Sequence, residues 1–177
     1  VLGYLAADAM AVGETDNIAI GANALGVFDE GTAGGDIDGN IAIGRNAMLG
    51  GDLAGNDRQV QDNIAIGRYA LDATSDNAHT GTIAIGGNAL TALTTGIQNI
   101  AIGYNAMLKH TTGVGNTVLG YGAMDDTDYD SNCLDSDYNT FIGWASGGGD
   151  WQAGKSEYNT FVGGASCASG LEGAVYN

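Results

Sequence analysis

Basic residues are scarce in this chain: only 5 of its 177 residues are Lys or Arg, against 21 Asp and Glu, which gives a formal net charge of −16. A surface this acidic repels the phosphates of nucleic acids and anionic membranes, so we expect neither as a partner. No apolar run reaches the roughly 18 residues that a membrane-spanning helix needs. We therefore expect no membrane insertion.

Cysteine and histidine are equally scarce. Cys133 and Cys167 are too few for a disulfide framework and lack the spacing of a metal site, so we expect free thiols. His79 and His110 have no nucleophile or acid at a recognisable catalytic spacing. Because no catalytic constellation emerges, the sequence predicts that the chain is not an enzyme.

The chain is rich in repeats instead. A block of the form Asn–hydrophobic–small–hydrophobic–Gly, followed by x-Asn-Ala-Leu/Met, first appears complete as "NIAIGANAL" (17–25). Successive copies begin 23, 23, 19, 17, 17, 23 and 20 residues apart, and none is closer than 17. A minimum spacing with variable excess is typical of a coil with fixed rungs and loops of different length. The block begins with Asn17, Asn40, Asn63, Asn99, Asn116, Asn139 and Asn159, and once with Thr82.

Each block predicts a short strand. In the first complete copy, Ile18 and Ile20 flank Ala19, with Asn and Gly at the two ends, and glycine recurs too often for a helix. We therefore expect an all-β fold, a β-solenoid (β-roll) of about nine rungs with variable loops. Gly21 permits the positive φ of a sharp turn, and the leading asparagines can form a hydrogen-bonded ladder between rungs.

The strand pattern also indicates an assembly. Ile18 and Ile20 point to one face of the strand and Ala19 to the other, so both faces are apolar. One face can line the interior of the coil, whereas the other needs cover from a second layer or another chain. We expect the alanines on the outside, where small side chains let sister copies approach closely around a common axis.

A single repeat array spans residues 1–177, and its composition changes near residue 116. The strand triplets read Ile-Ala-Ile in 1–115, and Thr-Val-Leu, Thr-Phe-Ile or Thr-Phe-Val in 116–177. Because bulk moves from one face of the strand to the other, we expect a change of cross-section near Asn116, with the chains further apart around Phe141 and Phe161. Partial copies at both ends predict that the chain is a fragment of a longer array.

Aromatic residues concentrate in the second half, with three in residues 1–100 and ten in residues 101–177. This distribution predicts either a larger local core with loop anchors or platforms on which sugar rings stack. Trp151, in the glycine-flanked segment "GGGDWQAGK", is the best single candidate for a platform. The candidate glycan-binding residues are Tyr121, Tyr129, Trp144, Trp151 and Tyr158.

One acidic segment resembles the start of a calcium loop. "DTDYDSN" (126–132) places Asp126, Asp128 and Asp130 at alternate positions. Ser131 stands where the loop needs glycine, and no Glu closes it. We interpret these acids as solvated loop charge, with calcium as the alternative and the one cofactor that the sequence suggests.

The repeats have a family resemblance. Segments such as "NALTALTTGIQNIAIGYNAM" (88–107) resemble the repeat shafts of bacteriophage tail fibres and related virion appendages, and are similar to the head repeats of trimeric autotransporter adhesins. The resemblance implies a homotrimer, intertwined or side by side, that acts in attachment to a cell surface. Gaps of up to 23 residues fit the fibre repeats better than the near-constant period of adhesin heads.

We therefore expect a structural and attachment protein: a segment of a trimeric viral tail fibre that binds a host surface glycan or another receptor. Its other partners would be its own copies and further tail proteins of the virion. The expected location is the virion or, for a cellular protein, the cell surface or extracellular space. The alternatives are the head of a cellular trimeric adhesin and a polysaccharide depolymerase built on a β-solenoid.

Overall fold

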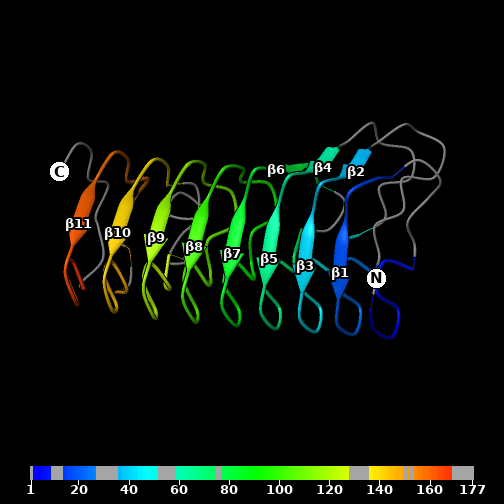
Figure 1. The fold of residues 1–177 in the computed structure, drawn as a ribbon. Coiled ribbons are helices and arrows are strands. Elements are labelled where there is room, and N and C mark those ends of the chain that lie inside the picture. Colours follow the sequence, from blue (N-terminus) through cyan, green and yellow to red (C-terminus); the bar gives the residue numbers. More distant parts are fainter. Residues whose placement is uncertain are drawn as a thin grey trace.

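The computed structural model describes residues 2–8, 14–26, 36–51, 59–74, 77–127, 136–149, 151 and 154–168. Within them the chain winds as a parallel β-solenoid, which confirms the predicted all-β repeat fold (Figure 1). No helix long and apolar enough to span a membrane occurs in these ranges. The main sheet contains, in this order, β1 (Ile18–Ile20), β3 (Ile41–Ile43), β5 (Ile64–Ile66), β7 (Ile83–Ile85), β8 (Ile100–Ile102), β9 (Thr117–Leu119), β10 (Thr140–Ile142) and β11 (Thr160–Val162).

Neighbouring strands of the main sheet pair in parallel, with equivalent residues of successive repeats side by side. Ile41 of β3 lies beside Ile18 on one side and Ile64 on the other. Leu2 forms an isolated parallel bridge to Ile20, so the pairing extends one turn beyond β1 without a further strand. Equivalent positions of the repeat therefore stack in columns along the coil.

A second, three-stranded parallel sheet accompanies the first turns. It consists of β2 (Asp36–Asp38), β4 (Gln59–Gln61) and β6 (His79–Thr80). Ile37, Val60 and His79 are fully buried at its inner face. Its exposed side carries Asp36 and Gln59, so this sheet is polar on the outside.

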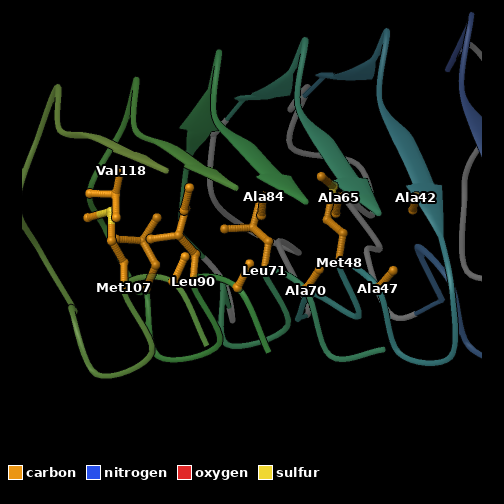
Figure 2. Packing of buried hydrophobic residues seen from close by; sticks show 14 of the residues in the cluster. Ala42, Ala47, Met48, Ala65, Ala70, Leu71, Ala84, Leu90, Met107 and Val118 are labelled. Carbon is orange, nitrogen blue, oxygen red and sulfur yellow. The ribbon is translucent and has the colours of Figure 1, made fainter. Parts of the chain in front are cut away.

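The interior is lined by the alanines of the strands, so the predicted orientation of the strand triplets is wrong. Ala42, Ala65 and Ala84 are fully buried (Figure 2). The isoleucines on either side of each are partly exposed and point outward. The wall opposite the strand, here called the far wall, contributes a leucine or methionine in six turns, such as Leu71 or Leu90. Isoleucines on the strand side would overfill this narrow space, so the small residue points inward.

The far wall follows directly after the strand glycine in each repeat. The chain reverses there through two residues with positive φ, such as Asn88 (58°) and Leu90 (53°). Positive φ is uncommon for a bulky side chain, and here it directs leucine or methionine into the core. The buried far-wall pairs are Ala24 and Leu25, Ala47 and Met48, Ala70 and Leu71, Ala89 and Leu90, Ala106 and Met107, and Ala123 and Met124.

The strands after residue 116 keep the same orientation, so their large central side chains point into the core and not to the outer side. Phe141 is fully buried, and its turn has Gly147 where the six turns before it have leucine or methionine. A Cβ on Gly147 would lie 2.6 Å from the Phe141 ring. The main sheet continues from β8 through β11 in unbroken register, because a large residue on one wall is balanced by a small one on the other.

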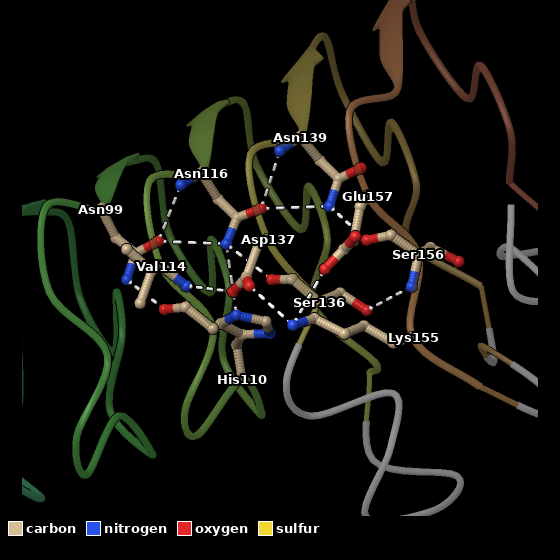
Figure 3. Close-up of polar contacts among 11 residues, drawn as sticks. Asn99, His110, Val114, Asn116, Ser136, Asp137, Asn139, Lys155, Ser156 and Glu157 are labelled. Atoms are coloured by element: carbon tan, nitrogen blue, oxygen red, sulfur yellow. Dashed lines mark hydrogen bonds and ion pairs between the residues drawn. The ribbon is translucent and has the colours of Figure 1, made fainter. Parts of the chain in front are cut away.

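Buried asparagines link consecutive turns at the start of each strand (Figure 3). Asn116 donates from Nδ2 to Asn99 Oδ1 (3.1 Å) and to the Ser136 carbonyl (2.9 Å). Its Oδ1 accepts from the backbone N–H of Asn139 (3.0 Å) and from Asn139 Nδ2 (3.1 Å). The amide thus forms four hydrogen bonds in a site closed to water, which matches its donor and acceptor capacity.

The same contacts recur along the chain except at Thr82. The side-chain amides bond from Asn17 to Asn40 to Asn63, and again from Asn99 through Asn116 and Asn139 to Asn159. Thr82 donates its backbone N–H to Asn63 Oδ1 (2.9 Å), but its buried Oγ1 has no hydrogen-bond partner. The amide ladder is therefore interrupted once, at the one turn whose leading residue is not asparagine.

Candidate functional site

The strand side chains that point away from the interior form one face, here called the outer face. It consists of the first and third residues of the eight main-sheet strands, which are Ile, Thr, Leu or Val throughout. Ile18 and Ile20 are 45% and 39% exposed, and Val162 reaches 69%. An uncharged, largely apolar face of this length is unusual on a chain with a net charge of −16.

Two columns of corner residues border the outer face. The N-side column holds the residue just before each ladder position: Asp16, Gly39, Asp62, Gly81, Gln98, Gly115, Tyr138 and Tyr158. The C-side column holds the residue just after each strand glycine: Tyr4, Ala22, Arg45, Arg68, Gly87, Tyr104, Tyr121, Trp144 and Gly164. Backbone hydrogen bonds such as Gly122 N–H to Tyr104 O (2.9 Å) tie successive turns together along the C-side column.

The large exposed apolar side chains of the described residues all lie on this side of the coil. They belong to the outer face, to its two bordering columns or to the turn before β1: Leu2, Tyr4, Leu5, Ile18, Ile20, Tyr104, Leu119, Tyr121, Tyr138, Trp144, Tyr158 and Val162. Exposed apolar residues scattered singly need no explanation, but a contiguous patch marks an interaction surface. The outer face with its two columns is therefore the candidate functional site.

The tyrosines of the columns stack on one another. The rings of Tyr104 and Tyr121 lie 5.5 Å apart, and those of Tyr138 and Tyr158 lie 5.2 Å apart. Stacking covers ring faces and turns the edges outward, which limits what Tyr121 and Tyr158 can offer to a sugar. Trp144 is 63% exposed, and it is the most accessible of the predicted platform residues that the structure describes.

Trp151, the best platform candidate in the sequence, is fully buried. Its ring packs against Phe141 with the centroids 5.6 Å apart, and its Nε1–H donates to the Gly147 carbonyl (2.8 Å). The residue fills the core beside a glycine and presents no ring face to solvent, so this expectation is wrong. Tyr129 lies outside the described residues.

The calcium hypothesis concerns a segment that is only partly described. Asp126 forms an ion pair with Lys109, with 2.8 Å between Oδ1 and Nζ, while Asp128 and Asp130 lie outside the described residues. Among the residues that the structure does describe, no three His, Cys, Asp or Glu side chains gather closely enough to hold a metal ion.

The histidines are buried in the core. His110 is completely buried, with Asn116 Nδ2 3.4 Å from Nε2 and Thr127 Oγ1 3.4 Å from Nδ1 (Figure 3). Burial lowers the pKa of His110 to about 4, against the opposing effect of Asp137 and a hydrogen bond to the Ser136 backbone. His79 is also buried, and its Nε2 lies 2.9 Å from the Thr94 carbonyl. Both rings are therefore neutral parts of the core at neutral pH.

Cys167 lies half-buried at the far wall of the last described turn. Burial raises the pKa of its thiol above the ordinary value of 9.0, which disfavours the reactive thiolate. Cys133 lies outside the described residues.

The bordering columns were not identified from the sequence, although a signal was present. Tyr104, Tyr121 and Trp144 each follow the strand glycine directly, so aligning the repeats on that glycine places them in one column. Treating the aromatic residues as members of loops concealed this regularity.

The chain matches no known protein family, and no curated protein or solved structure matches it.

Proposed function

We propose that the chain is a structural segment of a fibre in which three copies pack side by side through their outer faces. In this proposal the fibre serves attachment at the surface of a virion or cell. The observation that supports it most is the uncharged outer face, which runs along all eight strands of the main sheet. Covering such a face removes apolar surface from water and prevents non-specific association.

The repeat itself favours another copy of the same chain as the partner. A second copy has the same spacing between turns, so its side chains match the outer face along its whole length. Together with its two bordering columns, the face spans about seven residues at 3.3 Å each and about eight strands at 4.8 Å spacing, or roughly 900 Å². That is about the area that one partner contributes to a stable protein interface.

The charge distribution is compatible with close packing of copies. The outer face carries none of the 21 acidic residues, although the net charge of −16 makes copies repel one another at long range. The number three comes from the resemblance to tail-fibre and adhesin repeats. Two bordering columns give each copy one contact region for each of the two neighbours that it has in a ring.

The mass of the protein in solution tests this proposal. Native mass spectrometry of the wild-type chain at micromolar concentration is expected to show three copies. Ile41→Lys with Ile64→Lys places charge on the outer face and is expected to yield monomers. Asp36→Lys with Gln59→Lys places the same charges on the second sheet in adjacent turns, and should leave the trimer intact.

Circular dichroism then confirms that all three proteins keep their β structure. A folded wild-type monomer would contradict self-association, and a dimer would contradict the proposed number of copies. Equal effects of the two pairs of substitutions would mean that the outer face is not the contact.

Glycan binding is a second candidate function, favoured by the exposed ring of Trp144. Retention on immobilised host-surface polysaccharide is the measurement, with Trp144→Ala expected to abolish it and Gln59→Ala, on the second sheet, expected to preserve it. Equal retention of the two variants would argue against a site at Trp144. Shortening of the polysaccharide during incubation would instead support the depolymerase alternative.

A further inference from the structure

The two columns that border the outer face carry opposite charges in the first half of the coil. Asp16 and Asp62 lie in the N-side column, whereas Arg45 and Arg68 lie in the C-side column. All four side chains are exposed. The two columns lie at opposite ends of the same strands, so one chain cannot bring the acids of a turn to its own arginines.

The arginines differ from the described lysines in the ion pairs that they form within the chain. Lys109 pairs with Asp126, and Lys155 pairs with Asp137 (2.7 Å) and Glu157 (2.9 Å). Across the described ranges, neither Arg45 nor Arg68 forms an ion pair, and their guanidinium groups lie 6.0 and 5.2 Å from the centroid of the Tyr69 ring. In a chain with four times as many acids as bases, two exposed arginines without an acidic partner point to an acid supplied from outside.

The second half of the coil replaces charge with aromatic rings in both columns. Tyr104, Tyr121 and Trp144 follow one another in the C-side column, and Tyr138 and Tyr158 follow one another in the N-side column. Each of these rings is between 44% and 63% exposed. The C-side column becomes aromatic at the turn of β8, and the N-side column becomes aromatic two turns later, at the turn of β10.

Side chains of both columns lean by one turn toward β1. In the N-side column, a Cβ on Gly39 would lie 2.7 Å from Asp62 Oδ1, and a Cβ on Gly115 would lie 2.7 Å from the Tyr138 ring. In the C-side column, a Cβ on Gly87 would lie 3.2 Å from the Tyr104 ring. Because both columns lean in the same direction, copies at equal height place Asp62 level with Arg68.

We infer that neighbouring copies pack parallel and in register, with the C-side column of one copy against the N-side column of the next. Asp62 then lies opposite Arg68 of the neighbour, one turn from Arg45, and Tyr138 lies opposite Trp144, one turn from Tyr121. The inference rests on the proposed self-association and adds its polarity and its register. Contacts between two different columns repeat around a ring, and such contacts close it.

The other arrangements lose these matches. Antiparallel copies related by a two-fold axis place like columns together, so that arginines meet aromatic rings and aspartates meet tyrosines. A slip by one turn moves Arg68 from Asp62 to a glycine, Gly39 or Gly81, and a slip repeated from neighbour to neighbour prevents the ring from closing. In-register parallel packing is the arrangement that closes the ring and pairs Arg68 with Asp62 and Trp144 with Tyr138.

Cross-linking between neighbours tests the inference. In a background with Cys133→Ser and Cys167→Ser, Asp62→Cys and Arg68→Cys are introduced into one chain and treated with a short bis-maleimide. The two positions are six residues apart on a nearly extended segment, up to about 20 Å, so the reagent does not bridge them within one chain. The expected product is a covalent oligomer with the mass of the native assembly.

Each single-cysteine variant is the matched control, since parallel packing brings its thiol to no other thiol. Cross-linked dimers from Arg68→Cys alone would mean that like columns meet, which overturns the inference. An assembled protein whose double-cysteine variant gives no covalent oligomer would overturn it as well, while leaving the proposed fibre intact. An unassembled wild-type chain contradicts the proposed function itself.

Charge reversal gives an independent readout. Arg45→Glu with Arg68→Glu places like charges together and is expected to raise the dissociation constant of the assembly by about tenfold or more. Adding Asp62→Lys to the same chain restores an opposite charge beside the reversed positions and is expected to return the dissociation constant to within about threefold of wild type. Failure of Asp62→Lys to restore assembly would overturn the pairing.

Discussion

At the scale of single residues, the ladder asparagines show how a small polar side chain can hold a dry coil together. Asn116 satisfies both its donors and accepts two hydrogen bonds inside the core. Each bond contributes about 1 kcal/mol net, but leaving a buried partner unsatisfied costs about 1–3 kcal/mol. The stabilisation therefore depends on the whole column of asparagines, because each amide also satisfies hydrogen-bonding groups of the turns on either side.

Thr82 offers a direct test of this account. Thr82→Asn places an amide where the buried Oγ1 has no partner and gives Asn63 Oδ1 a second donor, so we expect a gain of about 1 kcal/mol in unfolding free energy. Denaturant unfolding measures it. Thr82→Val keeps the shape without the hydroxyl and is the control, expected to lie within about 0.5 kcal/mol of wild type. A less stable asparagine variant would show that neighbouring side chains leave no room for the amide.

The strand glycines are the second residue type that the coil cannot replace. Gly143 has φ +137°, and a Cβ there would lie 2.3 Å from the carbonyl oxygen of Gly163 in the next turn. Gly143→Ala is therefore expected to lower the unfolding free energy by about 3 kcal/mol or more. The adjacent corner provides a control, since a Cβ on Gly164 would meet nothing nearer than 4.0 Å.

Thermal unfolding followed by circular dichroism distinguishes the two glycine variants. Gly164→Ala is expected to stay within about 0.5 kcal/mol of the wild-type chain. Similar losses in both variants would mean that backbone crowding between turns does not explain the glycine column.

At the scale of the elements, each turn balances the volume of its two walls. Where the strand contributes alanine, the far wall contributes leucine or methionine, and where the strand contributes Phe141 the far wall contributes Gly147. Trp151 then packs against Phe141, and Phe161 stacks on it from the next turn at 5.5 Å. The balance lets turns of different composition share one sheet without a change of register.

The balance predicts that two harmful substitutions compensate each other. Phe141→Ala leaves a cavity and is expected to cost about 3–5 kcal/mol. Gly147→Met alone overfills the turn, since its Cβ would lie 2.6 Å from the Phe141 ring. The double variant reproduces the alanine and methionine pair of earlier turns, and is expected to be more stable than either single variant.

A double-mutant cycle on unfolding free energies measures this coupling. Additive losses would show that the two walls do not share one volume. The backbone permits the change, because Gly147 has φ +66° and Met107 occupies the equivalent position at +52°.

At the scale of the whole molecule, buried histidine makes stability depend on pH. The pKa of His110 is about 4 in the fold, against an ordinary value of 6.5. Between these two pH values the unfolded chain binds up to one proton more than the folded chain. The contribution of neutral His110 to the unfolding free energy is therefore full above pH 6.5 and is lost as the pH falls toward 4. The loss is about 3 kcal/mol for a shift of this size.

The variant His110→Gln isolates that effect. We expect the difference in unfolding free energy between wild type and variant to change by about 3 kcal/mol between pH 7 and pH 4, in favour of the variant at low pH. Asp72 acts in the opposite direction, since burial raises its pKa to about 6 and its protonation stabilises the fold as pH falls. That contribution is present in both proteins and cancels. A constant difference across this pH range would contradict the assignment to His110.

The outer face operates at the same scale, because no single turn makes an interface. One strand exposes two side chains, and only the stacking of eight strands creates a surface of about the size that a stable partner covers. The repeat therefore does two things at once. It builds a continuous core on one side of the strand and a continuous uncharged surface on the other.

The sequence alone determined the fold class and the position of nearly every main-sheet strand. The Ile-Ala-Ile triplets, the glycine after each and the spacing of the copies required short parallel strands stacked in register. These features depend on local preference and on repetition, and both can be read along the chain. The second sheet was not predicted, because "DID" and "QVQ" occur in only two turns and lack the repeat signature.

Only the tertiary structure decided which face of the strand is inside. The alternation of isoleucine and alanine does not by itself say which of the two side chains faces the core. That depends on the width of the coil. That width depends on the far wall, where Leu90 and Met107 already fill the space, and it also places Phe141 and Trp151 in the core. The candidate surface follows from the same choice, because the isoleucines that do not fit inside, and the corner columns beside them, form the outside of the main sheet.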